Sequence, residues 1–190
     1  MFPSDWDHSA LPEIGYELVE VSRDDSKYRE IENLFQQTMK DYSIRRLQRT
    51  WSLTLWQHFQ LFVSALLHSP CGSGAIQIMA GGPSRPLSVC LLLRFSFTHG
   101  FFWSLGRYFA RDASYSHQCC PSIIDHHSVF VAQVVVGDSV WGNQVYLLLP
   151  TRPGISNRLL DSCVDNRKNP SIFVIFEKHQ IYSAYILEYT

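Results

Sequence analysis

The chain has 190 residues and a mass of 21.9 kDa, so a single domain with its own hydrophobic core is the simplest organisation. Hydrophobic residues make up 46% and charged residues 17%, which excludes an intrinsically disordered chain. The formal net charge of −1 excludes binding of duplex DNA through bulk positive charge, and 5 irregularly spaced cysteines exclude a secreted disulfide framework. The acidic residues are spread unevenly, because residues 42–111 contain neither Asp nor Glu.

The N-terminal part predicts a strand followed by a helix. The alternating run Tyr16–Val21 favours a half-buried strand. Ser22 and Asp25 then form a candidate capping box. Beyond it, apolar residues recur at helical spacing, namely Tyr28, Ile31, Leu34, Phe35, Met39 and Tyr42. We interpret this stripe as the packing face of a helix.

Arginines and tryptophans are interleaved in the next segment, Ile44–Phe59, which contains Arg45, Arg46, Arg49, Trp51 and Trp56. Such interleaving occurs in surfaces that bind nucleic acid. Arginines that bury their stems at the end of a helix are more common, and we favour that interpretation. Nucleic acid is therefore not an expected partner.

Residues Leu61–Leu105 show neither a sustained helical period nor a strand period. Two clusters of Gly, Ser and Pro interrupt them, at Cys71–Gly74 and Gly81–Pro86. The most apolar stretch, Leu87–Leu105, carries Arg94 in mid-span, and a charge at the centre of a membrane helix costs about 2.5–3.5 kcal/mol. We do not expect a membrane span.

The chain from Tyr108 onward has the pattern of a β structure. Four segments predict strands: Ser128–Gly137, Val145–Pro150, Pro170–Glu177 and Ala184–Tyr189. Turn residues separate them without any helix-length pattern, which favours antiparallel pairing over βαβ winding. We therefore expect an α+β fold in which an N-terminal helical lead packs on an antiparallel sheet.

A group of soft donors and a single cysteine are candidates for chemistry. The donors, which could form a zinc site, are His117, Cys119, Cys120, His126 and His127. Adjacent cysteines do not easily direct both sulfurs at one tetrahedral ion, so we favour a polar loop and predict no metal. Cys163 has acidic neighbours that would raise the pKa of its thiol, so we do not expect it to act as a nucleophile.

Several motifs together resemble the catalytic domain of the PARP-type ADP-ribosyltransferases. They are GRYFARDASYS (Gly106–Ser116), DSCVD (Asp161–Asp165), NPSIFVIFEKHQIY (Asn169–Tyr182) and PSDWDHSALP (Pro3–Pro12), with support from Tyr28–Met39 and Ile44–Phe59. More narrowly, they are similar to the mono-ADP-ribosylating branch whose larger members carry CCCH zinc fingers and WWE domains. The resemblance covers residues 1–59 and about 99–190. It implies a split antiparallel β-sheet and one catalytic domain over residues 1–190.

The resemblance also implies a reaction. Members of this family bind NAD as a substrate, release nicotinamide and pass ADP-ribose to a side chain of an acceptor protein. The implied partners are thus NAD and protein acceptors. We expect no membrane partner, and this domain alone does not support binding of nucleic acid. Because the chain shows no secretory signal pattern, we expect an intracellular site, in the nucleus or the cytoplasm.

Three site residues follow from the family motifs. The Tyr of the family's His-Tyr-Glu triad matches Tyr108, a catalytic and NAD-binding residue, and the serine that helps to hold the carboxamide of NAD matches Ser116. The third triad position falls on Ile172. Polymer-forming members have Glu there, which polarises the ribose hydroxyl that accepts the next unit. An aliphatic side chain cannot do so, so the resemblance implies transfer of a single ADP-ribose.

The chain departs from the family at the first triad position. The triad His, in an HG[ST] motif, would fall near Ile76–Met79, where no His occurs. His68 is followed by Ser69 rather than Gly, and His99-Gly100 matches a different part of the family pattern. Cys119 replaces a second tyrosine that stacks on nicotinamide. The alternative hypothesis is therefore a catalytically impaired pseudoenzyme that serves as a binding or interaction module.

A second hypothesis concerns residues 60–98 as a whole, which are atypical of the family. A wrong splice choice or a gene-model error would leave flanking segments that match the family around an insert that matches nothing. Sequencing the transcript across this segment tests the hypothesis.

Overall fold

A computed structural model of the protein describes residues 15–67, 89–91, 106–119, 126–143 and 146–190. The helices within these ranges are α1 (Ser26–Gln36), α2 (Leu53–Leu67), α3 (Ala113–Cys119) and the single 3₁₀ turn η1 (Lys178–Gln180). The strands are β1 (Glu17–Glu20), β2 (Ile44–Trp51), β3 (Val89–Leu91), β4 (Arg107–Ala110), β5 (His127–Val134), β6 (Ser139–Trp141), β7 (Thr151–Arg152), β8 (Ile155–Leu159), β9 (Ser162–Val164), β10 (Ile172–Ile175) and β11 (Ile181–Tyr189).

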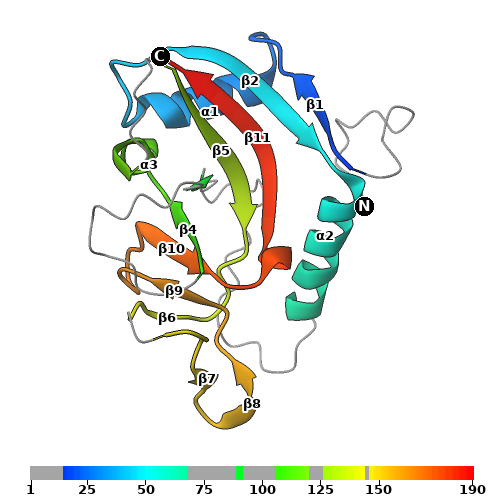
Figure 1. The fold of residues 1–190 in the computed structure, drawn as a ribbon, viewed down its shortest axis with the longest axis vertical. Coiled ribbons are helices and arrows are strands. Elements are labelled where there is room, and N and C mark those ends of the chain that lie inside the picture. Colours follow the sequence, from blue (N-terminus) through cyan, green and yellow to red (C-terminus); the bar gives the residue numbers. More distant parts are fainter. Residues whose placement is uncertain (1–14, 68–88, 92–105, 120–125, 144–145) are drawn as a thin grey trace.

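Across the described part of the chain, the strands form one sheet in the order β1-β2-β11-β5-β3-β4-β10-β9-β6, and β7 and β8 form a separate hairpin. Neighbouring strands of the sheet are antiparallel, except that β6 and β9 run parallel. The long strands β2, β11 and β5 curve side by side, whereas β10, β9 and β6 lie at an angle to them near the other end of the molecule (Figure 1). The predicted α+β class with a split antiparallel sheet is confirmed.

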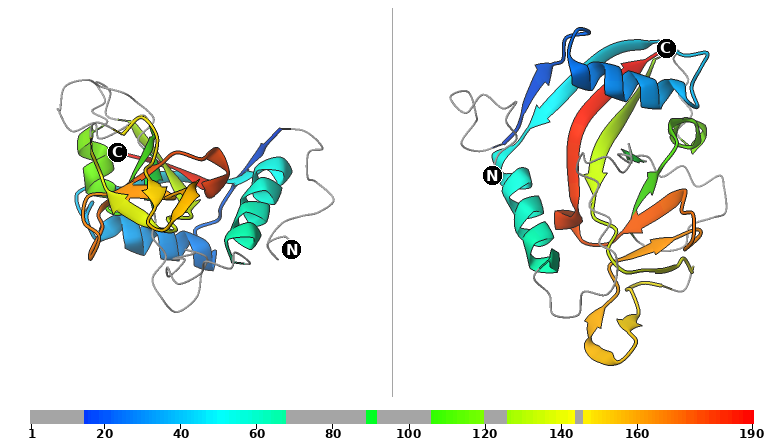
Figure 2. Two further views of the ribbon diagram at one scale, coloured as in Figure 1. Left: turned by 90° about the horizontal axis from the view of Figure 1, so that it is seen from below. Right: turned by 180° about the vertical axis from the view of Figure 1, so that it is seen from behind.

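Helix α1 packs across one face of the long strands, as Figure 2 shows from behind. Its buried residues Tyr28, Ile31 and Phe35 contact a core that includes Leu47 and Leu187. The predicted apolar stripe is therefore confirmed. The capping residue differs from the expected pair, because the Asp25 carboxylate alone accepts a hydrogen bond from the Lys27 N–H at 2.8 Å.

The segment expected to end a helix, beginning at Ile44, is instead the strand β2, which pairs with β1 and β11. The helical interpretation was wrong because burial along β2 does not alternate residue by residue. Arg45 and Arg46 are both exposed, and Leu47 and the polar Gln48 that follow are both buried, so the sequence lacks the period-2 pattern of a half-buried strand. A helix follows only from Leu53, and α2 extends it to Leu67.

The atypical segment 60–98 contributes to the described fold at two places. The last turns of α2 include Val63, which lies in a core with Phe59 and Tyr182. The short strand β3 lies between β5 and β4 and links the two halves of the sheet. Both elements form although Leu61–Leu105 shows no sustained helical or strand period in its sequence.

In the C-terminal part, three of the four predicted strands correspond to β5, β10 and β11. The strand expected at Val145–Pro150 does not form over its described residues 146–150. Tyr146 instead donates its backbone N–H to the Asn143 carbonyl at 3.1 Å, and Leu147 and Leu148 are exposed at the surface.

The expected absence of a membrane span rested on Leu87–Leu105, of which only residues 89–91 are described. In the part of the chain that the structure describes, we find no helix with the length and apolarity needed to cross a membrane.

Candidate functional site

Tyr108 and Ile172 lie on neighbouring antiparallel strands. In the register of β4 and β10, Tyr108 is opposite Val174 and Ile172 is opposite Ala110. Side chains that are directly opposite, or two residues apart along a strand, share a face of the sheet. Tyr108 and Ile172 are therefore diagonal neighbours on one face, and such neighbours lie roughly 7–8 Å apart. Tyr108 and Ile172 are the two triad positions that lie within the described residues, and the structure brings them together.

A glycine allows β4 to approach β10 this closely. A Cβ atom at Gly106 would lie 2.5 Å from Cγ1 of Val174 and 3.0 Å from the carbonyl oxygen of Ile175. Contacts this short do not occur without displacing one of the strands. The glycine that begins the GRYFA motif is thus required by the packing of the strand that carries Tyr108.

One side of Tyr108 is packed and the residue remains half-buried. It lies against a small core of Leu149, Cys163 and Val174, to which Tyr146 also packs. Cys163 is fully buried, and this burial raises the pKa of its thiol from 9.0 to about 11. The predicted direction of this pKa shift is confirmed, but its cause is burial rather than acidic neighbours, and the neutral thiol has a packing role.

Ser116 lies on α3, the helix that follows the strand of Tyr108 and packs back against β3 and β4. Its side chain is buried, with 1% of its surface exposed. The helix is anchored by His117, whose Nε2 is hydrogen-bonded to the Tyr42 hydroxyl at 2.9 Å and whose Nδ1 is hydrogen-bonded to the Tyr189 hydroxyl at 3.1 Å. This anchor sets the position of Ser116 relative to the sheet.

The residues that depart from the family pattern lie outside the described part of the chain, apart from the backbone of Cys119. Residues 76–79, where the triad His would fall, lie outside the described residues, as do His68 and His99. Cys119 is the last residue of α3, and its side chain is not among those described. The role of Ser116 and the absence of the triad His therefore stay predictions from the motifs.

Two residues that the motifs did not single out hold the segment before Ile172. The Asp165 carboxylate accepts hydrogen bonds from the backbone N–H groups of Ser171 and Ile172. The Arg111 guanidinium donates to Asn169, Pro170 and Ser171. Asp165 ends the DSCVD motif and precedes a turn rich in Asn and Pro, which is a signal for a carboxylate that binds turn N–H groups.

The soft donors considered for zinc do not form a metal site where they are described. Both ring nitrogens of His117 are engaged by tyrosine hydroxyls, and the ring of His127 stacks on Tyr189 with centroids 5.2 Å apart. His126 instead faces Glu188, with 3.8 Å between Nε2 and Oε2. Among the side chains that the structure describes, no three of His, Cys, Asp and Glu could hold a metal ion together. Cys120 lies outside these residues.

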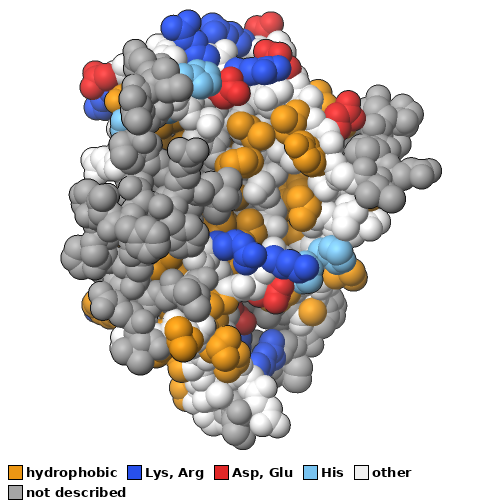
Figure 3. All heavy atoms as spheres, viewed as in Figure 1, with side chains coloured by type: hydrophobic (Ala, Val, Ile, Leu, Met, Phe, Trp, Pro, Cys, Tyr) orange, Lys and Arg blue, Asp and Glu red, His pale blue; other side chains and the backbone are white. Residues whose placement is uncertain are grey.

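Two of the three arginines of β2 are paired with acids, and the third, Arg45, donates its Nε to Oγ1 of Thr190 at 2.8 Å. Arg46 lies 3.8 Å from Glu20 and Arg49 lies 3.8 Å from Asp25, and the Arg49 guanidinium also lies over the ring of Tyr185. On the face in Figure 3, the Lys and Arg side chains at the upper end are interspersed with Asp and Glu. This arrangement gives no concentrated positive potential for a nucleic-acid backbone.

Comparison with known proteins identifies relatives over nearly the whole chain. The human protein mono-ADP-ribosyltransferase PARP12 is 36% identical over 195 residues, which cover 99% of this chain and 28% of that protein. The mouse protein mono-ADP-ribosyltransferase PARP11 is 32% identical over 214 residues, which cover 98% of this chain and 64% of that protein. The chain thus spans less than two thirds of the length of these relatives. No protein-family model matches the chain.

Tyr108 and Ile172, which share a face of the sheet, lie in segments that carry the motifs. The human protein mono-ADP-ribosyltransferase PARP11 is a further relative, at 31% identity over 214 residues that cover 98% of this chain. The chain therefore belongs to the family of PARP-type ADP-ribosyltransferases, in its mono-ADP-ribosylating branch.

Proposed function

We propose that the chain transfers one ADP-ribose from NAD to a side chain of an acceptor protein. In this reaction the bond between nicotinamide and the ribose carbon breaks, and its electron pair leaves with nicotinamide. A nucleophilic atom of the acceptor forms a bond to the same carbon and gives up its proton. The relatives are protein mono-ADP-ribosyltransferases, which supports the reaction class, and NAD and protein acceptors are the partners that it requires.

The observation that carries the proposal is the pair of Tyr108 and Ile172 on one face of adjacent strands. Tyr108 is half-buried, and its aromatic ring and hydroxyl are groups that can stack on and hydrogen-bond a planar, polar ligand. The neighbouring Ile172 has no group that could accept a proton or polarise a hydroxyl. A site with this pair supports a first transfer and does not support elongation of a chain of ADP-ribose units.

Positioning supplies most of the rate in this proposal. Cleavage of the nicotinamide bond needs NAD held in a bent form and its carboxamide fixed, so the gain comes from orientation and from stabilisation of developing charge. The buried hydroxyl of Ser116 is the group we assign to the carboxamide, on the strength of the motif and its place on α3 beside β4. Tyr108 holds the nicotinamide end of the substrate.

The purified chain, incubated with labelled NAD, tests the proposal. We expect label on protein, with one ADP-ribose at each modified side chain, and a loss on the order of 10²-fold for Tyr108→Ala. Tyr108→Phe separates the hydroxyl from the ring. Tyr115→Phe is the matched control, because Tyr115 lies at the surface of α3 and is expected to retain transfer.

The test also distinguishes the pseudoenzyme. Calorimetric titration with NAD that shows binding, without release of nicotinamide or label on protein, would contradict the transferase and support a binding module. Label that persists in Tyr108→Ala would contradict the assignment of the site while keeping the reaction.

We further propose that the chain acts in the nucleus or the cytoplasm. A cysteine content without a disulfide framework supports this location, and Cys163 is a free, buried thiol. Fluorescence imaging of the full-length protein in cells tests it, and a signal confined to the secretory pathway would contradict it.

A further inference from the structure

The position of Ile172 is set by hydrogen bonds from outside its own strand. Oδ1 of Asp165 accepts from the backbone N–H of Ser171 at 2.8 Å and from that of Ile172 at 3.0 Å. The backbone N–H of Asp165 in turn donates to the Ile172 carbonyl at 3.3 Å. Both backbone polar groups of Ile172 are therefore bonded to Asp165.

The same segment is held from the strand of Tyr108. The backbone N–H of Arg111 donates to the Ser171 carbonyl at 2.8 Å. Its Nη1 donates to Oδ1 of Asn169 at 2.8 Å and to the Pro170 carbonyl at 3.3 Å, and its Nη2 donates to Oγ of Ser171 at 3.2 Å. One side chain thus contacts three consecutive residues before Ile172.

These contacts matter because Ile172 is the first residue of β10 and Arg111 directly follows β4. At the end of a strand, the hydrogen bonds between strands hold a residue on one side only. The hydrogen bonds made by the segment that precedes the strand therefore determine the position of Ile172. Hydrogen bonds to a carboxylate or a guanidinium are stronger than those between neutral groups. A planar guanidinium can also hold several acceptors in a fixed geometry, which an ammonium group cannot.

We propose that Asp165 and Arg111 are positioning residues of the transferase site, which hold Ile172 against Tyr108 and thereby set where the acceptor approaches. The inference rests on the proposed function and names residues that neither touch substrate nor belong to the triad. A displaced Ile172 leaves room beside the reacting ribose carbon. Water then competes with the acceptor side chain, and free ADP-ribose forms in place of modified protein.

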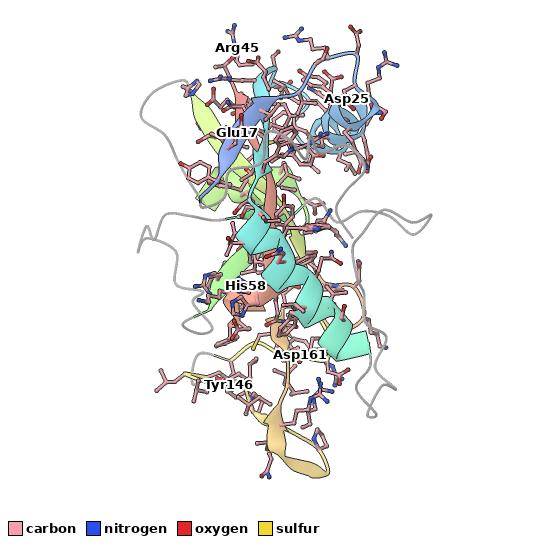
Figure 4. The ribbon with its side chains drawn as sticks, turned by 90° about the vertical axis from the view of Figure 1, so that its right-hand side faces the viewer. Glu17, Asp25, Arg45, His58, Tyr146 and Asp161 are labelled. Carbon is pink, nitrogen blue, oxygen red and sulfur yellow. The ribbon has the colours of Figure 1, made fainter. Side chains whose placement is uncertain are left out.

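The experiment compares two aspartates that make the same kind of bond. Asp165→Ala removes the carboxylate beside Ile172, and Asp165→Asn keeps an Oδ1 acceptor. Asp25→Ala is the matched control, because Oδ1 of Asp25 also accepts from a backbone N–H, that of Lys27, at 2.8 Å. Figure 4 places Asp25 at the opposite end of the molecule from Tyr146, which packs on the same core as Tyr108.

For each purified variant, kcat and KM for NAD are measured together with the ratio of free to protein-bound ADP-ribose. In Asp165→Ala we expect kcat for transfer to fall about 10- to 100-fold with little change in KM, and the share of free ADP-ribose to rise. Asp165→Asn restores most of the transfer, and Arg111→Lys shows a partial form of the same defect. Asp25→Ala lowers thermal stability but leaves the ratio unchanged.

Two results overturn the proposal. One is an unchanged ratio in folded Asp165→Ala. The other is an equal change of the ratio in Asp25→Ala, since that change would report stability alone.

Amide hydrogen exchange, measured without NAD, tests the positioning role of Asp165 independently of the proposed function. We expect faster exchange at Ser171 and Ile172 in Asp165→Ala, by about tenfold or more, and no such change in Asp25→Ala. A wild-type chain that turns over no NAD overturns the proposed function and any role of the two residues in transfer. Unchanged exchange in Asp165→Ala overturns the positioning itself, whatever the activity.

Discussion

At the scale of single residues, Gly137 occupies a position that disfavours any residue with a Cβ atom. Its φ is +59°, in the left-handed region that favours glycine. A Cβ at this position would lie 2.3 Å from Oδ2 of Asp161. That oxygen accepts from the Asp138 N–H at 2.7 Å and from Nη2 of Arg152 at 2.6 Å. An added methyl group would therefore displace a carboxylate that is already bonded twice.

We expect Gly137→Ala to lower the free energy of unfolding by about 2–4 kcal/mol, from backbone strain and from loss of these bonds. Gly154→Ala is the matched control, because Gly154 has a φ of +81° but no atom within 4 Å of the added Cβ. In Gly154→Ala the free energy of unfolding should fall only by the backbone strain, about 1–2 kcal/mol. Urea unfolding of both variants measures the difference, and equal losses would show that contact with Asp161 contributes nothing.

At the scale of elements, α3 depends on a cluster of rings around His117. Tyr42 and Tyr189 bond its two nitrogens, and the ring of His127 lies 4.6 Å away, between centroids. Burial is the main cause that lowers the pKa of His117 below 6.5, and the nearby charge of His127 adds to it. The folded chain thus favours neutral His117, and Ser116 is the residue immediately before it on α3.

The sign of the pH dependence follows from this pKa. Below about pH 6.5 the unfolded chain binds a proton at His117 that the folded chain resists, so stability falls as the pH is lowered. We expect a lower melting temperature at pH 5 than at pH 7.5, and a smaller difference in His117→Gln. His58→Gln, at an exposed position of α2, should keep the wild-type difference. An undiminished difference in His117→Gln would contradict the assignment.

At the scale of the whole molecule, Arg152 ties the β7–β8 hairpin to the main sheet. Its guanidinium bonds the carboxylates of Asp138 and Asp161, and its Nε donates to the Leu159 carbonyl at 3.1 Å. Asp161 also donates its backbone N–H to the Asp138 carbonyl at 2.9 Å, and Nε2 of Gln180 donates to the Asp161 carbonyl at 3.1 Å. Connections from four parts of the chain therefore meet at two largely buried ion pairs that share Arg152.

Removing the cation of this group leaves two carboxylates facing each other in a largely buried site. We expect Arg152→Ala to lower the free energy of unfolding by about 2–4 kcal/mol, toward the range for breaking a buried pair. Lys27→Ala, which removes the exposed pair with Glu30, should cost less than about 1 kcal/mol. Urea unfolding at neutral pH measures both, and a similar small loss in the two variants would contradict a structural role for Arg152.

Local patterns predicted those parts of the fold whose signal lies within a few residues. The stripe of α1 and the apolar runs of β5, β10 and β11 were predictable because burial of one element follows from its own periodicity. Strand β2 was missed because Gln48 is buried in it. The strand expected at Val145–Pro150 was wrong because an apolar run does not show whether a partner strand is in reach.

The sequence by itself determined the family, the α+β class, and the candidate residues Tyr108, Ser116 and Ile172, since these depend on residue type and local order. Only the tertiary structure decided that Tyr108 and Ile172 share a face, and that Asp165 and Arg111 hold the turn before Ile172. These relations join residues far apart along the chain, and strand register sets them. No pattern within one segment contains that register, because it results from packing all the strands together.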